Sequence, residues 1–210
     1  MNHDFKSREV AYTRILRDCK VSTGYIGKIA NAATLIQASA GRYRAVSEIV
    51  HVPWPLIGAI HRKESSGKFT CNLHNGQPLD IVTTIVPKGR GPFKSWEESA
   101  IDALKGKRRL IDSIDTIDGA WSLEQCLWFA EAYNGFGYLS HGINSPYLWA
   151  GTTAYTKGGY PRDGHYDPEH VVKNAGVAGI LLWGFSSRDL KTENMLHDGV
   201  RFIESDANEV

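Results

Sequence analysis

The chain has 210 residues, of which 42% are hydrophobic and 22% are charged. This composition is typical of a globular domain with a sizeable core, and it excludes wholesale disorder. The 24 basic and 23 acidic residues give a net charge of +1, so no strong overall field draws the chain to nucleic acid or to an anionic membrane. We therefore expect a single domain over residues 1–210 without a nucleic-acid partner. A monomer is a separate expectation.

The cysteines and the apolar stretches show whether a disulfide-rich, zinc-binding or membrane-spanning protein is expected. Cys19, Cys71 and Cys126 are far apart and lack the spacing of a zinc site, so a disulfide framework is not expected, although one disulfide with a free thiol stays open. The longest apolar stretch, residues 177–185, is shorter than the roughly 18 residues that span a bilayer. The N-terminal residues contain no apolar signal region, so the sequence shows neither a membrane span nor a signal peptide.

Helices are expected in the first part of the chain. Small and apolar residues recur at helical spacing over residues 11–19 and 28–50. Gly41 weakens or breaks the second of these helices. Pro55 suits the first turn of a shorter helix that ends near Glu64.

The middle of the chain predicts a loop followed by more helices. Glycine and proline are dense over residues 65–94, and the β-branched run at 81–86 predicts a small strand or hairpin inside a long functional loop. Helices then resume at two capping-box signatures, which begin at Ser95 and Ser122.

The last part of the chain combines a loop and further helices. Residues 135–167 are rich in Gly, Tyr and Pro, which indicates an ordered surface loop. The Asp-Pro pair at 167–168 caps and opens a helix that runs to about residue 185. Gly176 and Gly179 let another element pack closely against that helix.

One mostly helical domain with a small β-element in the middle accounts best for these patterns. We expect the N-terminal helices, about 8–50, to pack on a core of about 53–203. A final helix is expected over about 193–203. The predicted fold class is α+β, predominantly helical.

Glu64 has a position in the sequence that suits a catalytic acid. On the short helix that ends near Glu64, this residue shares one face with Ile57 and Ile60. Burial raises the pKa of such a carboxyl group, and the partial negative charge of a helix C-terminus acts in the same direction. A glycosidase general acid needs this property. The alternative is a structural glutamate that turns to water or pairs with Lys68.

A second segment carries a resemblance to a known family. Glu64 and Ser65 follow an apolar helix, and Ala-Tyr-Asn-Gly follows later at 132–135. Together these motifs resemble the goose-type lysozyme and soluble lytic transglycosylase superfamily, and most closely phage-endolysin-like lysozyme proteins. The resemblance covers about residues 53–185. Further matching segments are Leu-His-Asn-Gly-Gln-Pro-Leu at 73–79, Tyr-Asn-Gly-Phe-Gly-Tyr at 133–138 and Ser-Pro-Tyr-Leu-Trp at 145–149.

The resemblance implies a lysozyme-like fold with a small β-lobe and a substrate groove. It implies a muramidase that cleaves the β-1,4 bond between N-acetylmuramic acid and N-acetylglucosamine, with Glu64 as the catalytic acid and no cofactor. The partner is then the glycan strand of peptidoglycan, and the place of action is the cell wall, outside the membrane or after release by a phage. The expected substrate-binding residues are Ser65, His74, Glu131, Tyr133, Asn134, Tyr138, Tyr147 and Trp149.

The roles of several of these residues have alternatives. Aromatic faces suit sugar rings because they bury the apolar C–H face, but Tyr138, Tyr147 and Trp149 could equally pack on the domain. A hydrolase also needs a base about 6.5–9.5 Å from the acid, or a nucleophile about 5–5.5 Å from it. Asp80, on the expected β-loop, is the first candidate and Glu131 the second, and either could be a surface charge.

The outcome of cleavage and the preferred glycan are also open. A Gly-Leu-Met-Gln-like stretch, usual in lytic transglycosylases soon after the acid, is absent, so both hydrolysis and an anhydro-sugar product stay possible. Intact peptidoglycan is anionic, whereas this chain has little net positive charge. A preference for deacetylated glycan, which carries free amines, is therefore a further hypothesis.

The sequence also bears on metal-dependent, nucleotide-dependent and non-catalytic functions. Asp163 and Asp167 lack the spacing of an EF-hand, so no metal site is expected. The His-x-x-Glu fragment at 61–64 lacks the second histidine of a zinc hydrolase, although His51 and His74 could converge on it. No nucleotide-binding motif occurs. A non-catalytic glycan-binding module is the main alternative, since it could use the same aromatic residues without an acid.

Overall fold

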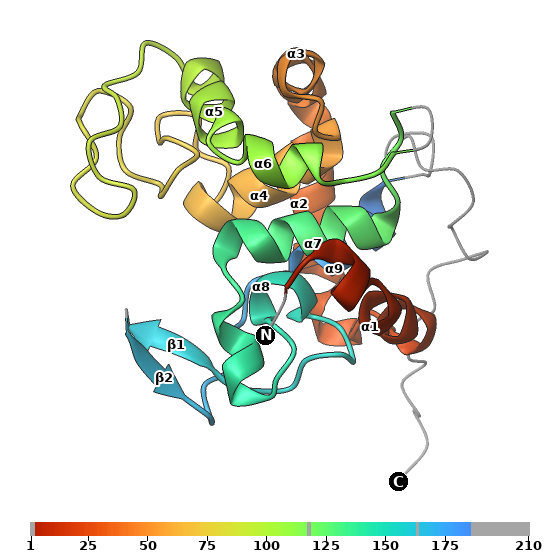
Figure 1. Cartoon of the computed structure of the whole chain (residues 1–210). Helices are drawn as coiled ribbons and strands as arrows, with labels where there is room; N and C mark the ends of the chain where they lie inside the picture. Colours follow the sequence, from red (N-terminus) through yellow and green to blue (C-terminus); the bar gives the residue numbers. More distant parts are fainter. Residues whose placement is uncertain (1–2, 117–118, 163, 186–210) are drawn as a thin grey trace, which may run out of the picture.

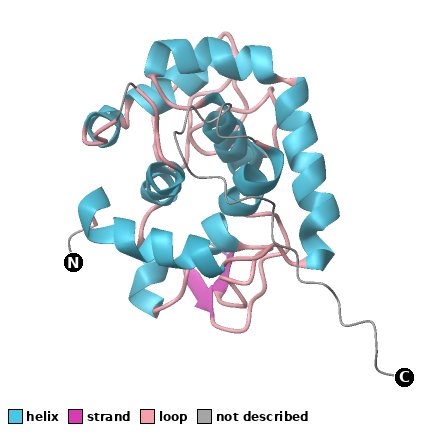
Figure 2. Ribbon diagram, turned by 90° about the vertical axis from the view of Figure 1, so that its right-hand side faces the viewer, coloured by secondary structure: helices cyan, strands magenta, loops and turns pink. Residues whose placement is uncertain are grey.

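The computed structural model describes residues 3–116, 119–162 and 164–185 (Figure 1). The helices, with 3-10 helices marked η, are α1 Phe5–Asp18, η1 Thr23–Tyr25, α2 Ile26–Ala38, α3 Ala40–Val50, α4 Trp54–Ser65, α5 Trp96–Lys105, α6 Arg108–Asp112, α7 Leu123–Asn134, η2 Gly137–His141, α8 Pro146–Trp149 and α9 Val177–Gly184. The strands β1 Gly159–Arg162 and β2 His165–Asp167 form an antiparallel pair. Figure 2 shows this pair at one edge of the helical body. The coarse prediction of a mainly helical α+β chain is confirmed.

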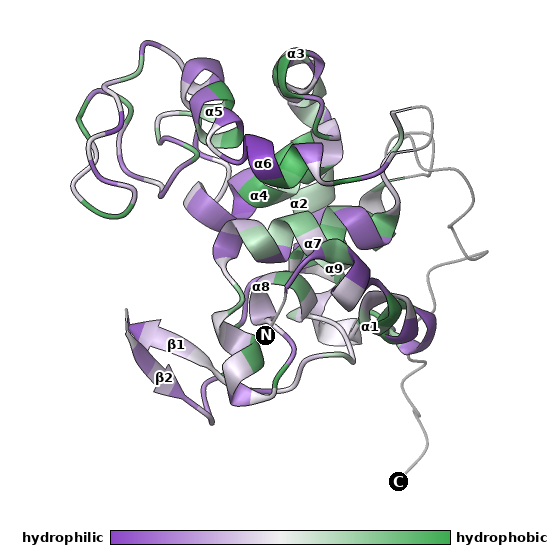
Figure 3. Cartoon of the chain, in the orientation of Figure 1, coloured by the Kyte–Doolittle hydropathy of each residue, from purple (hydrophilic) through white to green (hydrophobic). Residues whose placement is uncertain are grey.

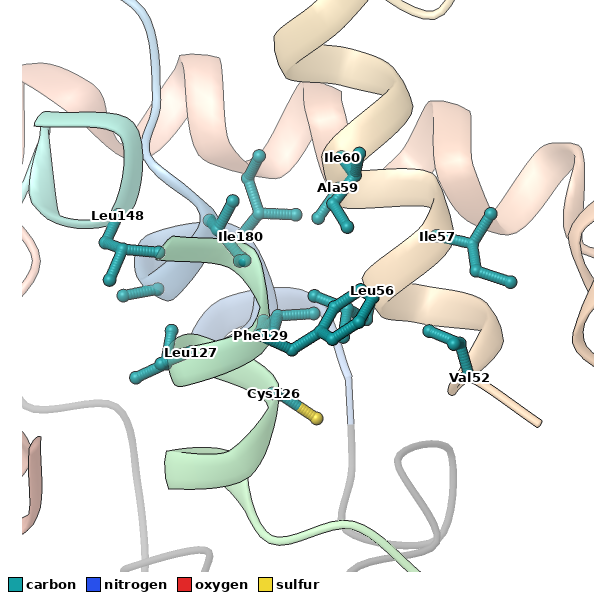
Figure 4. Close-up of a cluster of buried hydrophobic side chains, with 14 of the residues drawn as sticks. Val52, Leu56, Ile57, Ala59, Ile60, Cys126, Leu127, Phe129, Leu148 and Ile180 are labelled. Carbon is teal, nitrogen blue, oxygen red and sulfur yellow. The ribbon is translucent and has the colours of Figure 1, made fainter. Parts of the chain in front are cut away.

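The core forms where α4 and α7 meet the other helices. All residues of α4 from Trp54 to His61 are buried, as are those of α7 from Leu123 to Glu131. Figure 4 shows side chains of α4 and α7 converging with Leu148 of α8 and Ile180 of α9. Each fully buried aliphatic side chain stabilises the fold by about 1.5–3 kcal/mol. The same helices carry much of the apolar colour in Figure 3.

The N-terminal helices pack on this core as three separate contacts. α1 lies against α7, α2 against α9, and α3 against α4. α1 begins at Phe5, earlier than expected, because the Asp4 side chain accepts a hydrogen bond from the Ser7 backbone N–H and caps the helix. The expected helix over 28–50 is broken at Ser39, two residues before Gly41.

Both predicted helix caps are present. The Ser95 hydroxyl accepts from the Glu98 backbone N–H and starts α5. Ser122 and Gln125 form a full capping box at the start of α7, in which each side chain accepts from the other residue's backbone N–H.

The prediction of a strand or hairpin at 81–86 is wrong. These residues form an irregular loop whose apolar side chains are exposed, with Val86 at 81%, whereas Thr83 is buried. The loop is held by its own side chains instead: Gln77 accepts from the backbone N–H groups of Thr84 and Ile85, and Thr83 donates to the Pro87 carbonyl. Without a neighbouring strand, β-branched residues do not form a sheet.

The hairpin lies instead within residues 135–167, which the sequence indicated as loop. The expected helix start at 167–168 is also wrong, because Asp167 belongs to β2 and its side chain caps a turn by accepting from the Glu169 N–H. The helix begins at Val177, after Gly176.

Two glycines allow α9 to pack closely, as expected. A side chain at Gly176 would overlap the Leu148 carbonyl, and one at Gly179 would press on Ile29. The expected helix over 193–203 lies outside the described residues.

The sequence predicted neither a disulfide framework nor a membrane span, and the structure bears on both. Cys19, Cys71 and Cys126 are all free thiols. Within the described part of the chain, no helix combines the length and the apolar character that crossing a membrane requires.

Candidate active site

The end of α4 places Glu64 at the surface of the core. The helix ends because Ser66 adopts the left-handed conformation, with φ of 56°, and the Gly67 N–H bonds the His61 carbonyl at 3.2 Å. Gly76, with φ of +76°, brings the following loop onto this helix end, where any Cβ would overlap the Glu64 carbonyl oxygen. Glycine at position 76 therefore lets the loop pack directly against the backbone at the end of α4.

Glu64 opens into a cavity of about 760 Å³. The cavity lies between the end of α4, the loop after it, and the helices α5 and α7. Its lining residues are Glu64, His74, Asn75, Val86, Pro87, Arg90, Asp102, Ala103, Gly106, Lys107, Tyr133 and Asn134. Figure 1 shows the ends of α4 and α7 on the side from which this loop and the β-hairpin project.

The environment of Glu64 moves its pKa into the neutral range. Burial raises the pKa of Glu64 to about 7, because the ionised form loses its hydration. The Tyr147 hydroxyl donates a hydrogen bond to Oε1 at 2.8 Å and opposes this rise, as do the positive charges of Lys63 and Lys107. The result is a carboxyl group that can give up a proton at neutral pH.

Two tyrosines lie beside the acid, of which Tyr147 is buried and Tyr133 is half-buried. Burial raises the pKa of Tyr133 and of Tyr147 well above the usual value, so both hydroxyls remain neutral donors. Tyr147 donates to Glu64, whereas Tyr133 donates to the Leu73 carbonyl at 2.7 Å. Tyr133 therefore ties α7 to the loop that covers the cavity.

A second charged cluster faces the same cavity. Arg90 binds both carboxylate oxygens of Asp102, with its Nε donating at 2.9 Å, and this pairing lowers the pKa of Asp102. Because Asp102 is ionised, His74 Nε2 must donate the 2.8 Å bond between them. Burial lowers the pKa of His74, so its ring is neutral near pH 7. Its Nδ1 makes no hydrogen bond to any described residue and carries a lone pair.

The structure brings half of the expected site together. Glu64, His74, Tyr133 and Asn134 line the cavity, and Tyr147 reaches Glu64 from behind it. The remaining expected residues are Ser65, Asp80, Glu131, Tyr138 and Trp149, and none of them lines it.

Asp80 and Ser65 lie outside the cavity for different reasons. Asp80 is an exposed residue of the loop. The Ser65 hydroxyl lies 3.4 Å from the His61 carbonyl and bonds back to the helix end.

Glu131 is a core residue that joins two helices. It is 1% exposed and accepts a short hydrogen bond from the Tyr12 hydroxyl of α1. Arg8 Nη2 lies 3.6 Å from the same carboxylate. This carboxylate is therefore fully occupied by α1 and has no access to the cavity.

The two remaining aromatic residues pack elsewhere. Trp149 is buried in the core. Tyr138 packs edge-on against Tyr160 of the β-hairpin, with 5.3 Å between the ring centroids.

The histidines in the described part of the chain do not group into a metal site. His61 is buried, its Nε2 donates to the Lys68 carbonyl at 3.2 Å, and its Nδ1 accepts from the Tyr43 hydroxyl at 2.9 Å. Burial lowers the pKa of His61 to about 4, so it is a neutral structural residue. Across the described residues, no three His, Cys, Asp or Glu side chains group as metal ligands.

Sequence reasoning missed three charged residues of the cavity, Arg90, Asp102 and Lys107. Asp102 and Lys107 follow the predicted cap at Ser95, so their helical region was visible. No local pattern shows which carboxylate of a helix turns to a cavity. The hydrogen bond between Asp102 and His74 and the electrostatic effect of Lys107 on Glu64 arise only in the folded chain.

The chain was compared with known families, proteins and structures. The chain has no match among protein-family models, curated proteins or solved structures.

Proposed function

We propose that this chain cleaves a glycosidic bond of peptidoglycan, with a lysozyme-like fold and Glu64 as the general acid. The observation that carries the proposal is a carboxyl group whose pKa is raised to about 7 by burial and which opens into a cavity of about 760 Å³. A protonated carboxyl group in such a place can protonate a leaving glycosidic oxygen. The resemblance of the motifs around Glu64 and Tyr133 supports the β-1,4 bond after N-acetylmuramic acid as the target.

The lining residues can position a sugar. Asn75 and Asn134 carry amide groups that can donate to and accept from hydroxyl and acetamido groups. The apolar side chains of Val86 and Pro87 offer a surface for the C–H face of a ring. The proposed glycan thus lies between the loop and α7, with its scissile oxygen at Glu64.

Hydrolysis needs a group that activates water, and His74 is the candidate. Asp102, the other acidic side chain in the lining, is held by Arg90 and is not a free nucleophile. His74, in contrast, is neutral and fixed by Asp102 with Nδ1 free to accept a proton from water. Hydrolysis through His74 is therefore our first proposal for the outcome.

Two alternatives concern the product of cleavage and the preferred glycan. In a transglycosylase, a hydroxyl group of the sugar itself attacks and gives an anhydro product, which needs no base for water. A preference for deacetylated glycan would need an acidic subsite, but Asp102 is already paired with Arg90. A monomer that acts at the cell wall remains our expectation.

The test is mass spectrometry of the products released from purified cell walls, acetylated and deacetylated. We expect reducing-end disaccharides from the wild type and none from Glu64→Gln, with a loss of at least about 100-fold. Asp80→Asn is the matched control and keeps its activity. Anhydro products that depend on Glu64 would place the chain with the transglycosylases. Intact glycan on both walls refutes cleavage, and glycan binding that survives in Glu64→Gln then identifies a binding module.

A further inference from the structure

A second cavity lies on the other side of the α4 end and contains cations. It has a volume of about 240 Å³. Its lining residues are Lys28, Asn31, Ala32, Arg62, Lys63, Ser66, Asn174, Ala175 and Ile180. Three of these side chains are basic and none is acidic. We infer that this cavity is a binding site for a phosphate group.

Two of the cations are anchored on one segment of backbone. Lys28 Nζ donates to the Lys173 carbonyl at 2.9 Å, and Lys63 Nζ donates to the Ala175 carbonyl at 3.3 Å. Both carbonyls belong to the segment just before α9. The two ammonium groups are thus positioned by the fold rather than by a carboxylate.

Arg62, near the end of α4, is the third basic residue of this cavity. Its Nη1 donates to the Ser66 carbonyl, which holds the guanidinium against the end of α4. No ion pair to Lys28, Arg62 or Lys63 occurs within the described ranges. The acidic side chain that acts on Lys63 is Glu64, its neighbour, which lines the other cavity. With a pKa of about 7, Glu64 is ionised in only about half of the molecules at pH 7 and balances only part of the Lys63 charge.

Lys63 is a half-buried cation without a paired carboxylate, which is a costly arrangement. Burial lowers the pKa of Lys63 to about 8, which shows that its charge has lost much of its hydration. The Ala175 carbonyl oxygen at 3.3 Å and the Tyr147 ring, whose centroid lies 5.4 Å from Nζ, compensate for only part of that loss, because neither carries a negative charge. An anion between Lys63 and Arg62 would supply the missing charge and accept several charge-assisted hydrogen bonds.

The size and the neutral lining favour a phosphate group. The cavity is about one third of the volume of the Glu64 cavity, which suits a compact oxyanion rather than a chain of sugar rings. Asn31, Asn174 and Ser66 add side chains that can donate to phosphate oxygens. Binding at this site does not depend on glycan cleavage at Glu64.

Titration calorimetry with inorganic phosphate at pH 7 tests the site, with ionic strength held constant by sodium chloride. We expect saturable binding to the wild type. Arg62→Gln and Lys28→Gln should each weaken it by about tenfold, since each removes a charged donor. Lys157→Gln is the matched control, because Lys157 is paired with Glu169 on the surface, and it should bind as the wild type does.

A second arm of the titration identifies the source of the phosphate. Glycerol 1-phosphate represents a small monoester, and poly(glycerol phosphate) represents a phosphodiester polymer. Binding of the monoester alone supports a small-molecule site, and binding of both supports a polymer ligand. Absence of saturable phosphate binding, or equal affinity in Arg62→Gln, Lys28→Gln and wild type while circular dichroism shows all three folded, overturns the inference.

Discussion

Ionisation of Glu64 should cost the folded protein stability. The pKa of Glu64 is about 7 in the fold, against an ordinary value of 4.5. The stability that protonation provides is full below about pH 4.5 and is lost as the pH rises through 7. Glu64→Gln cannot ionise, so we expect it to match the wild type at pH 4 and to exceed it at pH 8 by about 1–3 kcal/mol.

Urea unfolding at the two pH values measures this difference. Asp80→Asn is the control, because Asp80 is an exposed carboxylate outside the cavity. Equal or lower stability of Glu64→Gln at pH 8 would show that Glu64 is not buried as the structure has it.

The Tyr147 hydroxyl should hold the pKa of Glu64 down. It donates at 2.8 Å to Oε1 and so favours the ionised carboxylate. Tyr147→Phe removes this donor, and we expect the pKa of Glu64 to rise by about one unit. A carbon-13 NMR titration of the Glu64 carboxyl group measures the change.

Tyr133→Phe is the matched control for this titration. Tyr133 lines the same cavity, but its hydroxyl donates to the Leu73 carbonyl and not to Glu64. The pKa of Glu64 should therefore stay closer to the wild-type value than in Tyr147→Phe. The same shift in both variants would contradict a specific role for the Tyr147 hydroxyl.

At the scale of elements, the loop over the cavity depends on Gly76. Gly76 and Gly89 both have positive φ, of +76° and +78°, but only Gly76 meets the backbone of α4. Gly89→Ala should cost about 1–2 kcal/mol for its conformation alone, and Gly76→Ala should cost about 1–3 kcal/mol more for the overlap. Thermal unfolding compares the two variants, and equal losses would show that the loop does not rest on the Glu64 carbonyl.

An element can be predicted from the sequence when the residues that determine it are close neighbours in the chain. The helix that bears Glu64 and the caps at Ser95 and Ser122 depend on neighbours in sequence, and the sequence predicts them well. The strand expected at 81–86 fails because a strand needs a partner, and side chains such as Gln77 satisfy that backbone instead. A short Asp-Pro signal at 167–168 was equally compatible with the turn that the structure contains.

At the scale of the whole molecule, some residues of the candidate site can be predicted from local sequence and others cannot. The apolar stripe that ends at Glu64 is local, so its burial and raised pKa could be expected from the sequence. Choosing a second group is not local. Asp80 is near Glu64 in sequence but exposed, whereas Asp102 comes from another helix and meets His74 only in the folded chain. Glu131 lies directly before the Ala-Tyr-Asn-Gly motif at 132–135 but faces α1.

The contact of Glu131 with α1 should help to hold the N-terminal helix on the core. The Tyr12 hydroxyl donates to the Glu131 carboxylate, with both side chains buried, so Tyr12→Phe leaves a buried carboxylate without its main donor. We expect a loss of about 1–3 kcal/mol and faster hydrogen exchange in α1 and α7 together. Thr13→Ala removes a weaker, partly exposed bond to Glu124 at 3.2 Å and should cost less. Loss confined to α1 would show that α1 docks independently of Glu131, whereas coupled loss makes Glu131 a structural residue rather than a glycan ligand.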